Sequence, residues 1–380
     1  MALLEIDQFL ATSIAEDAPW PASWTQPAAK TVLIERALYH GIAGLLIENE
    51  DRLPGWPTDV VSRFRNQALA QAMWELRHKV VVSQLLTKLA DQDIVAIILK
   101  GTALAYDLYE TPATRARGDS DILVERRDLQ RTREILAELG FRKNSLSIDT
   151  SDEHNLQEVW ELTSTDGTTH IVDLHWQVMN CLALRDTLSF ADCAAELRPL
   201  PRLCAAAVTM GRTAALMHAC MHRAAHFVSP YIVDGKTYQG GDRLIWAVDI
   251  DRLANALTES DWDRLCVDAV ERGVGPVCLD GLIFAQARLG TAIPANAAKA
   301  LSVAGPNGGA STYLLHSGQA RRALEELKAV PGISGKAKYL LRRVLPPANF
   351  MRARYSEMAG RPLFLLYAWR LTELMRKRPT

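Results

Sequence analysis

Apolar residues recur at helical spacing through most of the chain. Residues 28–50 and 61–91 show this period, and the prolines and glycine between them predict a break. In the second half, the same period predicts helices over residues 208–227, 242–257, 261–272, 278–289 and 311–329. Two stretches rich in glycine and proline, residues 229–241 and 304–309, interrupt this half, and the first is long enough for a loop over a substrate.

The pattern changes in the second quarter of the chain. A run of β-branched and aliphatic residues at 94–99 predicts a short buried strand, and residues 119–124 predict another. Residues 126–140 read as an amphipathic helix, whereas residues 158–162 and 170–178 resemble the two strands of a hairpin. We therefore predict an α+β fold, with a small mixed sheet of about four strands, flanking helices and a helical C-terminal domain.

These changes of pattern divide the chain into four predicted parts. An amino-terminal helical segment takes residues 1–67, and a catalytic domain containing the sheet takes residues 68–185. A helical domain takes residues 186–330, and a basic, aromatic-rich tail takes residues 331–380.

Composition is that of an ordinary soluble protein. The chain has 380 residues, 48% of them hydrophobic, and a formal net charge of −1, so it can bury a sizeable core. No apolar run approaches the ~20 residues that cross a bilayer, and we expect a cytoplasmic protein. The six cysteines form no close pairs, which argues against a zinc ribbon or a disulfide framework. The near-zero net charge argues against a general nucleic-acid binder.

The first predicted strand ends in Lys100, Gly101 and Thr102. Glycine permits a tight turn and close approach of a ligand, and the helix that follows directs free N–H groups forward, so a phosphate would suit this position. Lys100 either neutralises phosphate charge or simply reaches water at the strand end.

Two carboxylates begin the second strand. Asp119 and Asp121 are two residues apart, so a strand places them on one face, where they repel each other. Such pairs are tolerated mainly where a hard cation, Mg²⁺ or Mn²⁺, neutralises them. Asp173 lies in an alternating segment and can face the same cation from a neighbouring strand. A phosphatase motif of the dehalogenase type is disfavoured by Leu123, and a glycosyltransferase leaves Asp173 without a role.

Together these motifs resemble the nucleotidyltransferase superfamily. The resemblance is to a bacterial branch with Lys-Gly first, then Arg and Asp-x-Asp, then Val-Asp-x-His-Trp, as at residues 172–176, and it extends to residues 243–249 and 345–355. It implies transfer of a nucleoside monophosphate from an NTP to an acceptor hydroxyl or phosphate. Two divalent metals would be held by Asp119, Asp121 and Asp173, and Asp173 would help to deprotonate the acceptor.

Further phosphate contacts are predicted from the same motifs. By the resemblance, Gly101 and Thr102 hold the triphosphate. Arg115 and Arg117 precede the two acids, where an arginine can hold phosphate with two hydrogen bonds, and Arg115 fits the branch pattern. Alternatively, these arginines only form salt bridges that offset Asp119 and Asp121.

Candidate acceptor-side residues follow later in the chain. His218, His222 and His226 fall on one stripe of a predicted helix, but zinc would need a third ligand that the pattern does not supply. We expect this helix to line the catalytic cleft, with His222 or His226 touching substrate. Arg243 and Asp249 match the branch pattern and can complete the acceptor side. The alternative for Asp249 is a charge on the helix surface.

His175 stands two residues after Asp173 and would share its strand face. It either orients a metal ligand or packs in the core.

Two other function classes fit the same motifs. One is a non-catalytic NTP-binding or regulatory partner on the same fold, and the other is a kinase-like phosphotransferase. The sequence predicts an NTP as partner and leaves the acceptor open among small molecules, peptides and proteins.

The tail is strongly basic. From residue 336 to 380 it has eleven Lys or Arg against two Glu. It also contains six aromatic residues: Tyr339, Phe350, Tyr355, Phe364, Tyr367 and Trp369. Three interpretations remain open: helices packed by their apolar face, binding to an anionic membrane surface or membrane-bound partner, and nucleic-acid contact.

Overall fold

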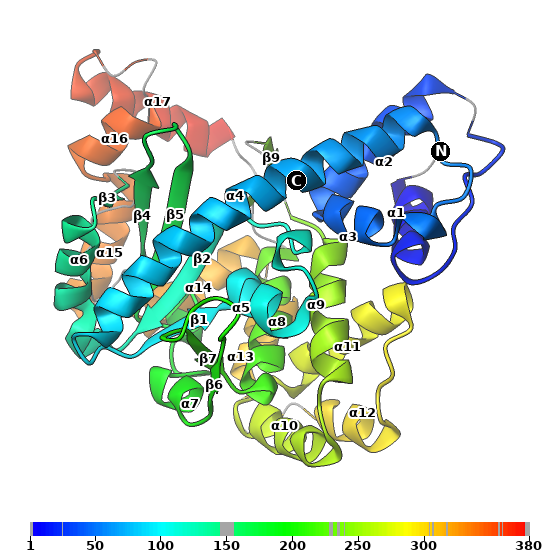
Figure 1. Cartoon of the computed structure of the whole chain (residues 1–380). Coiled ribbons are helices and arrows are strands. Elements are labelled where there is room, and N and C mark those ends of the chain that lie inside the picture. Colours follow the sequence, from blue (N-terminus) through cyan, green and yellow to red (C-terminus); the bar gives the residue numbers. More distant parts are fainter. Residues whose placement is uncertain are drawn as a thin grey trace.

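A sheet and a group of helices make up most of the molecule. The computed structural model describes residues 3–24, 26–144, 156–227, 231–233, 236–238, 240–303, 305, 308–316, 318–355, 358 and 360–376. The sheet lies on one side and most helices on the other, and the long helix α4 (Thr58–Ala90) runs across both (Figure 1).

The sheet is mixed and has seven strands, in the order β3-β4-β5-β2-β1-β7-β6. Their bounds are β1 (Ala96–Leu99), β2 (Asp119–Val124), β3 (Arg142–Lys143), β4 (Gln157–Thr163), β5 (Thr169–His175), β6 (Leu197–Pro199) and β7 (Val208–Met210). Strand β1 pairs antiparallel with β2 and parallel with β7, and β2 pairs parallel with β5. The predicted α+β class is therefore confirmed, and β4 and β5 form the predicted hairpin.

The prediction of about four strands was wrong, and so was the predicted start of the helix at residue 208. Val208 and Thr209 instead pair with β1, and Thr209 Oγ1 donates to the Ile98 carbonyl over 2.8 Å. The helix α8 (Arg212–Phe227) begins only after this strand. Short strands of this kind owe their conformation to a neighbouring strand, because three residues carry too little periodicity of their own.

Strand β1 is apolar throughout because both of its faces are covered. Ile97 and Leu99 lie in one hydrophobic core with α8 and the amino-terminal helices, whereas Ala96 and Ile98 lie in a second core with α4. Continuous apolar runs are typical of strands buried on both faces.

The amino-terminal helices are α1 (Leu3–Ala15), α2 (Pro27–His40) and α3 (Ala43–Glu48). The helical character predicted for residues 28–50 is confirmed, but two helices share this range, because Gly41 adopts φ +71° and ends α2. Left-handed glycine is a common helix stop. Helix α4 runs unbroken through the predicted domain boundary at residues 67–68, and the domain boundaries stay a prediction.

The remaining elements fill the second half and the connections. The helices are α5 (Lys100–Leu108), α6 (Leu129–Glu138), α7 (Phe190–Ala194), α9 (Leu244–Asn255), α10 (Glu259–Glu271), α11 (Gly275–Leu289), α12 (Ala295–Leu301), α13 (Gly309–Ser311) and α14 (Gln319–Ala329). A π-helical segment, Thr312–His316, interrupts the helix predicted over residues 311–329. The predicted loop at 229–241 contains the strand pair β8 (Tyr231–Val233) and β9 (Lys236–Tyr238); its other residues up to 239 lie outside the described chain.

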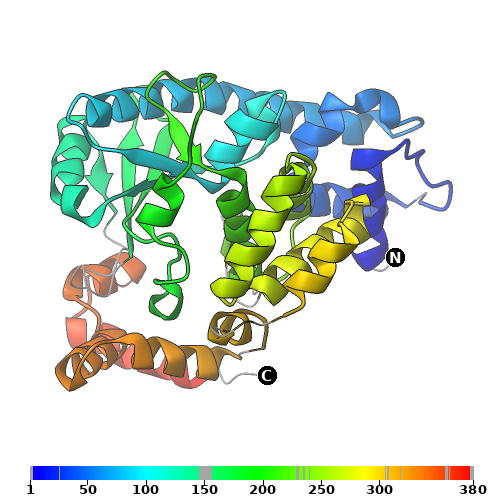
Figure 2. The ribbon, with the colours of Figure 1, turned by 90° about the horizontal axis from the view of Figure 1, so that it is seen from below.

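The basic tail forms three helices, α15 (Ile333–Val344), α16 (Ala348–Arg354) and α17 (Leu363–Arg376). Viewed from below, they form a layer at one edge of the molecule (Figure 2). Among the described residues, no helix combines the length and hydropathy needed to cross a bilayer.

Candidate nucleotidyltransferase site

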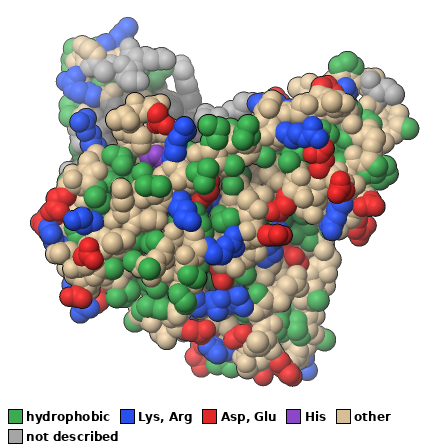
Figure 3. Space-filling view, in the orientation of Figure 1, with side chains coloured by type: hydrophobic (Ala, Val, Ile, Leu, Met, Phe, Trp, Pro, Cys, Tyr) green, Lys and Arg blue, Asp and Glu red, His purple; other side chains and the backbone are tan. Residues whose placement is uncertain are grey.

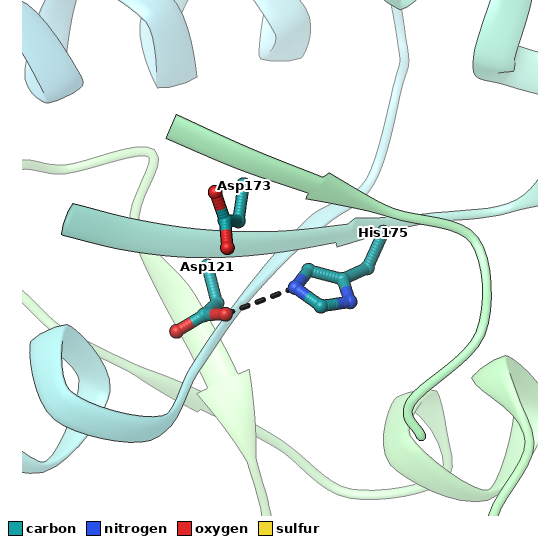
Figure 4. A group of neighbouring side chains, drawn as sticks. All are labelled: Asp121, Asp173 and His175. Carbon is teal, nitrogen blue, oxygen red and sulfur yellow. Dashed lines mark hydrogen bonds and ion pairs between the residues drawn. The ribbon is translucent and has the colours of Figure 1, made fainter. Parts of the chain in front are cut away.

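The parallel pairing of β2 with β5 brings acidic side chains together. In this register Asp121 is opposite Asp173, and Asp121 is also opposite Leu99, the last residue of β1. Figure 4 shows Asp121, Asp173 and His175 converging from the two neighbouring strands. One ligand atom from each of these three residues lies within 4.8 Å of the others, close enough to bind one metal ion. Sequence alternation thus places the predicted acids on one face.

Asp121 is the most enclosed of the three acids. Its Oδ1 accepts a hydrogen bond from Lys100 Nζ over 2.6 Å and lies 2.9 Å from His175 Nε2. Burial would raise the pKa of Asp121, but the Lys100 ammonium and the His175 contact outweigh burial and hold this pKa well below its ordinary value. Lys100 reaches this position from a left-handed backbone with φ +49°, which is strained for a residue with a side chain.

The pKa values of the other two acids are raised rather than lowered. Burial and the neighbouring Asp121 raise the pKa of Asp119 to about 6, although Lys100 opposes this. Burial, Asp121 and Asp119 raise the pKa of Asp173 to about 8. Carboxylate oxygens are the ligands that Mg²⁺ and Mn²⁺ prefer, and Asp121 and Asp173 supply them here, with His175 Nε2 beside Asp121 Oδ1. The residues present therefore fit the predicted metal.

The turn at Lys100, Gly101 and Thr102, which was predicted to hold a phosphate, differs from the prediction in its backbone and side-chain contacts. Its left-handed residue is Lys100 rather than Gly101. The Thr102 hydroxyl is buried, where it lies 2.8 Å from Ser120 Oγ and accepts from Arg117 Nε over 3.0 Å. The residue that precedes α5, Leu99, has an apolar side chain and forms no capping hydrogen bond to the first turn. The backbone N–H groups of this turn are therefore the part of it best suited to an anion.

Arg115 is fixed by a carboxylate from the helical half of the chain. Its Nε and Nη2 donate to both oxygens of Asp249 on α9 over 2.7 to 3.1 Å, and Tyr109 Oη donates to Asp249 Oδ1 over 2.7 Å. Burial would lower the pKa of Arg115, but Asp249 outweighs it and raises this pKa. Asp249 is buried and is not a surface charge. A side chain on Gly101 would come within 3.4 Å of the Arg115 guanidinium.

Arg117 is also paired with a protein carboxylate. It forms a buried ion pair with Glu75 on α4, and Tyr106 Oη donates to the same carboxylate. On the same helix, His78 Nε2 lies 2.8 Å from Ser120 Oγ. The contacts of Glu75, Tyr106 and His78 with this loop and strand were not predicted from the sequence. Two features of the sequence could have indicated these contacts. One is the presence of polar residues on the stripe of α4 that faces the sheet, and the other is strand alternation, which points Ser120 to the face opposite Asp119 and Asp121.

Comparison with protein families gives one match. A family model described as an uncharacterised nucleotidyltransferase matches residues 27–290. The chain belongs to this family. No curated protein and no solved structure matched the chain in similar comparisons. The family match confirms the resemblance read from the sequence, and it spans α2 to α11, including the acid cluster, while leaving the tail helices outside.

Two clefts of this nucleotidyltransferase-family chain adjoin the acid cluster. The first, which we name the helical-side cleft, is a narrow space between the start of α5 and the helices α8 and α9. Residues lining it include Lys100, Arg115, Arg212, His218, His222 and Trp246. Burial, and secondarily Lys100, lower the pKa of His218 to about 3, so this imidazole is neutral. Its Nε2 is buried without a hydrogen-bond partner among the described residues.

The second, the amino-terminal cleft, is wider and lies beside the helices α2 to α4. Asp119, Gly118, Arg117 and Arg243 are among its lining residues. Arg243 Nε donates to the Tyr39 carbonyl over 2.7 Å.

The predicted acceptor-side residues are therefore divided. His222 and Asp249 line the helical-side cleft, and Arg243 lines the amino-terminal cleft. The ring centroid of His226 lies 4.4 Å from that of His222 and 6.0 Å from that of Trp246. His175 is fully buried in the acid cluster. Their contact with an acceptor stays a prediction, as does phosphate contact by Arg115 and Arg117.

The Arg115–Asp249 pair generates a stability prediction. We expect Asp249→Asn to lower the free energy of unfolding by about 3 to 5 kcal/mol, because it leaves the buried Arg115 charge without a counter-charge. Tyr109→Phe removes only one hydrogen bond to Asp249 and should cost about 1 kcal/mol. Urea unfolding followed by circular dichroism measures both. Equal losses in the two variants would contradict a dominant role for the ion pair.

Proposed function

We propose that this protein transfers a nucleoside monophosphate from an NTP to a hydroxyl or phosphate group of an acceptor. The observation that carries the proposal is the register of β2 on β5, which sets Asp121 opposite Asp173, with Asp119 two residues before Asp121 on β2, in a chain of the nucleotidyltransferase family. In the reaction, an acceptor oxygen forms a bond to the α-phosphorus, and the bond to pyrophosphate breaks.

Asp119, Asp121 and Asp173 would hold divalent cations, and His175 would fix the orientation of Asp121. When bound, Mg²⁺ or Mn²⁺ stabilises charge on the phosphates and lowers the pKa of an acceptor hydroxyl. Asp173 is the proposed acceptor of the hydroxyl proton, because burial and the two neighbouring acids make it the most basic of the three carboxylates. With the ordinary pKa of an aspartate, Asp173 would be a weaker base.

The two clefts suggest how the substrates divide. The helical-side cleft offers the Trp246 ring and apolar side chains for a base, with Lys100 and Arg212 for phosphates. The first turn of α5 adds backbone N–H groups. The amino-terminal cleft opens at Asp119 and is proposed for the acceptor.

A non-catalytic NTP-binding protein is the second candidate. The observation that favours it is the contact of Lys100 with Asp121, which offsets part of the acid charge without a cation. Mass spectrometry of modified acceptors separates nucleotidyl transfer from phosphoryl transfer, and an absence of any modified acceptor favours the binding protein.

Nucleotide binding tests the metal-site assignment. Each NTP is titrated calorimetrically with and without Mg²⁺ into the wild type and into Asp119→Ala with Asp121→Ala. We expect one NTP to bind with Mg²⁺ only, and the double variant to bind it at least about a hundredfold more weakly, since two metal ligands are lost. The matched control replaces the exposed pair Glu134 and Glu138 by alanine. Equal binding by the wild type and the Asp double variant would sink the assignment.

Lys100→Met tests the role of the lysine beside the acids. Methionine keeps the chain length and removes the charge, so the metal-free protein should melt at a lower temperature and Mg²⁺ should restore more stability than in the wild type. Differential scanning fluorimetry across a Mg²⁺ titration measures this, with the exposed Lys88→Met as control. If Mg²⁺ raises the melting temperature of the wild type, Lys100→Met and the control by the same amount, Lys100 does not share the charge of the metal site.

A further inference from the structure

The tail helix α15 turns apolar side chains outward. Ile333, Leu340, Leu341 and Val344 are 89%, 48%, 58% and 46% exposed. Their spacing of i, i+7, i+8 and i+11 places them on one face of the helix. On the other side, Tyr339 packs against a small cluster with the body of the protein. The exposed apolar face of α15 is thus not the face that packs against the rest of the protein.

Helix α17 shows the same arrangement. Phe364, Leu365 and Trp369 are 68%, 40% and 51% exposed, whereas Leu366 is fully buried with Phe350 and Met351 of α16. One face of α17 therefore packs in a small core with α16, whereas the other face exposes large apolar and aromatic side chains. Contiguous apolar exposure of this kind marks an interaction surface.

The charge of the tail indicates what that surface contacts. Residues 336–380 carry eleven Lys or Arg and two Glu, although the whole chain has a net charge of −1. Helix α15 alone has four basic residues and no acidic one. Lys and Arg side chains gather at the upper left of Figure 3, where α16 and α17 lie. Positive charge is thus concentrated on the helices that expose the apolar stripes.

We propose that α15 and α17 bind the surface of an anionic lipid bilayer. Apolar and aromatic side chains enter the boundary between headgroups and acyl chains, while neighbouring Lys and Arg side chains contact lipid phosphates. A second copy of this chain would bring two basic surfaces together, which electrostatic repulsion opposes. A nucleic acid would match the charge but leave the aliphatic stripe of α15 uncovered.

The surface lies outside the part of the chain that the family model matches. The family match ends at residue 290, before any of these helices. Because no described helix has the length and hydropathy to span a bilayer, the proposed contact lies on the membrane surface. Its consequence would be to hold the candidate site close to a lipid surface.

Vesicle flotation of the full chain tests the proposal. We expect the wild type to float with vesicles of phosphatidylcholine mixed with phosphatidylglycerol, and much less with phosphatidylcholine alone. Lys338→Gln with Arg361→Gln should weaken binding about twenty-five-fold at low salt, at about fivefold for each charge removed. Lys88→Gln with Lys299→Gln, two exposed lysines outside the tail, should leave binding unchanged.

A second pair of variants tests the apolar stripe. Ile333→Ser with Leu341→Ser should weaken vesicle binding about tenfold or more, because two exposed aliphatic groups are lost. The matched control is Leu69→Ser with Leu76→Ser, since α4 exposes these leucines to 61% and 70%. Circular dichroism melting confirms that each variant is folded.

Three results would overturn the proposal. They are equal flotation of the wild type with both kinds of vesicle, an equal effect of the tail and control variants, and light scattering that shows the wild type as a dimer broken by Ile333→Ser with Leu341→Ser. The last would assign the surface to a second copy of the chain. None of these results bears on nucleotide binding at the acid cluster, so the two proposals fail separately.

Discussion

The carboxylates of Asp119, Asp121 and Asp173 lie close together in a poorly solvated place, and their mutual repulsion constrains the structure around them. The sheet register keeps two of them adjacent, because Asp121 and Asp173 are directly opposite on parallel strands. Lys100 takes a strained backbone conformation from which its ammonium reaches Asp121. A divalent cation would offset the repulsion among these carboxylates and would keep all three ionised at neutral pH.

A second set of buried ion pairs holds the surrounding loop. Arg115 is paired with Asp249 of the helical half, and Arg117 is paired with Glu75 of α4. The segment between α5 and β2 is thereby fixed to both sides of the sheet. An arginine held in this way is less free to turn toward a ligand. The fixed guanidinium of Arg115 lies against Gly101 and so shapes the start of α5. The rigidity of the site thus depends on contacts between distant parts of the chain.

Local pattern in the sequence was enough to predict the α+β class, the β4–β5 hairpin and the shared face of the acids, because alternation and helical period act over a few residues. It was not enough for β6 and β7, since three-residue strands form only by pairing with a neighbour. The partners of Arg115 and Arg117 could not be predicted either, because Asp249 and Glu75 are far away in the sequence. The sequence also did not predict that two separate clefts lie beside the site, one at Asp119 and the other at Lys100.

Diffraction from crystals grown with Mn²⁺ and a non-hydrolysable NTP analogue tests the central claim most directly, because anomalous scattering locates the metal without any assumption about the acceptor. The account predicts an anomalous peak between the carboxylates of Asp121 and Asp173, absent in crystals of Asp121→Asn, with the analogue phosphates near Lys100 and the first turn of α5. A peak that persists in Asp121→Asn, or a bound analogue with no metal at these carboxylates, would contradict it.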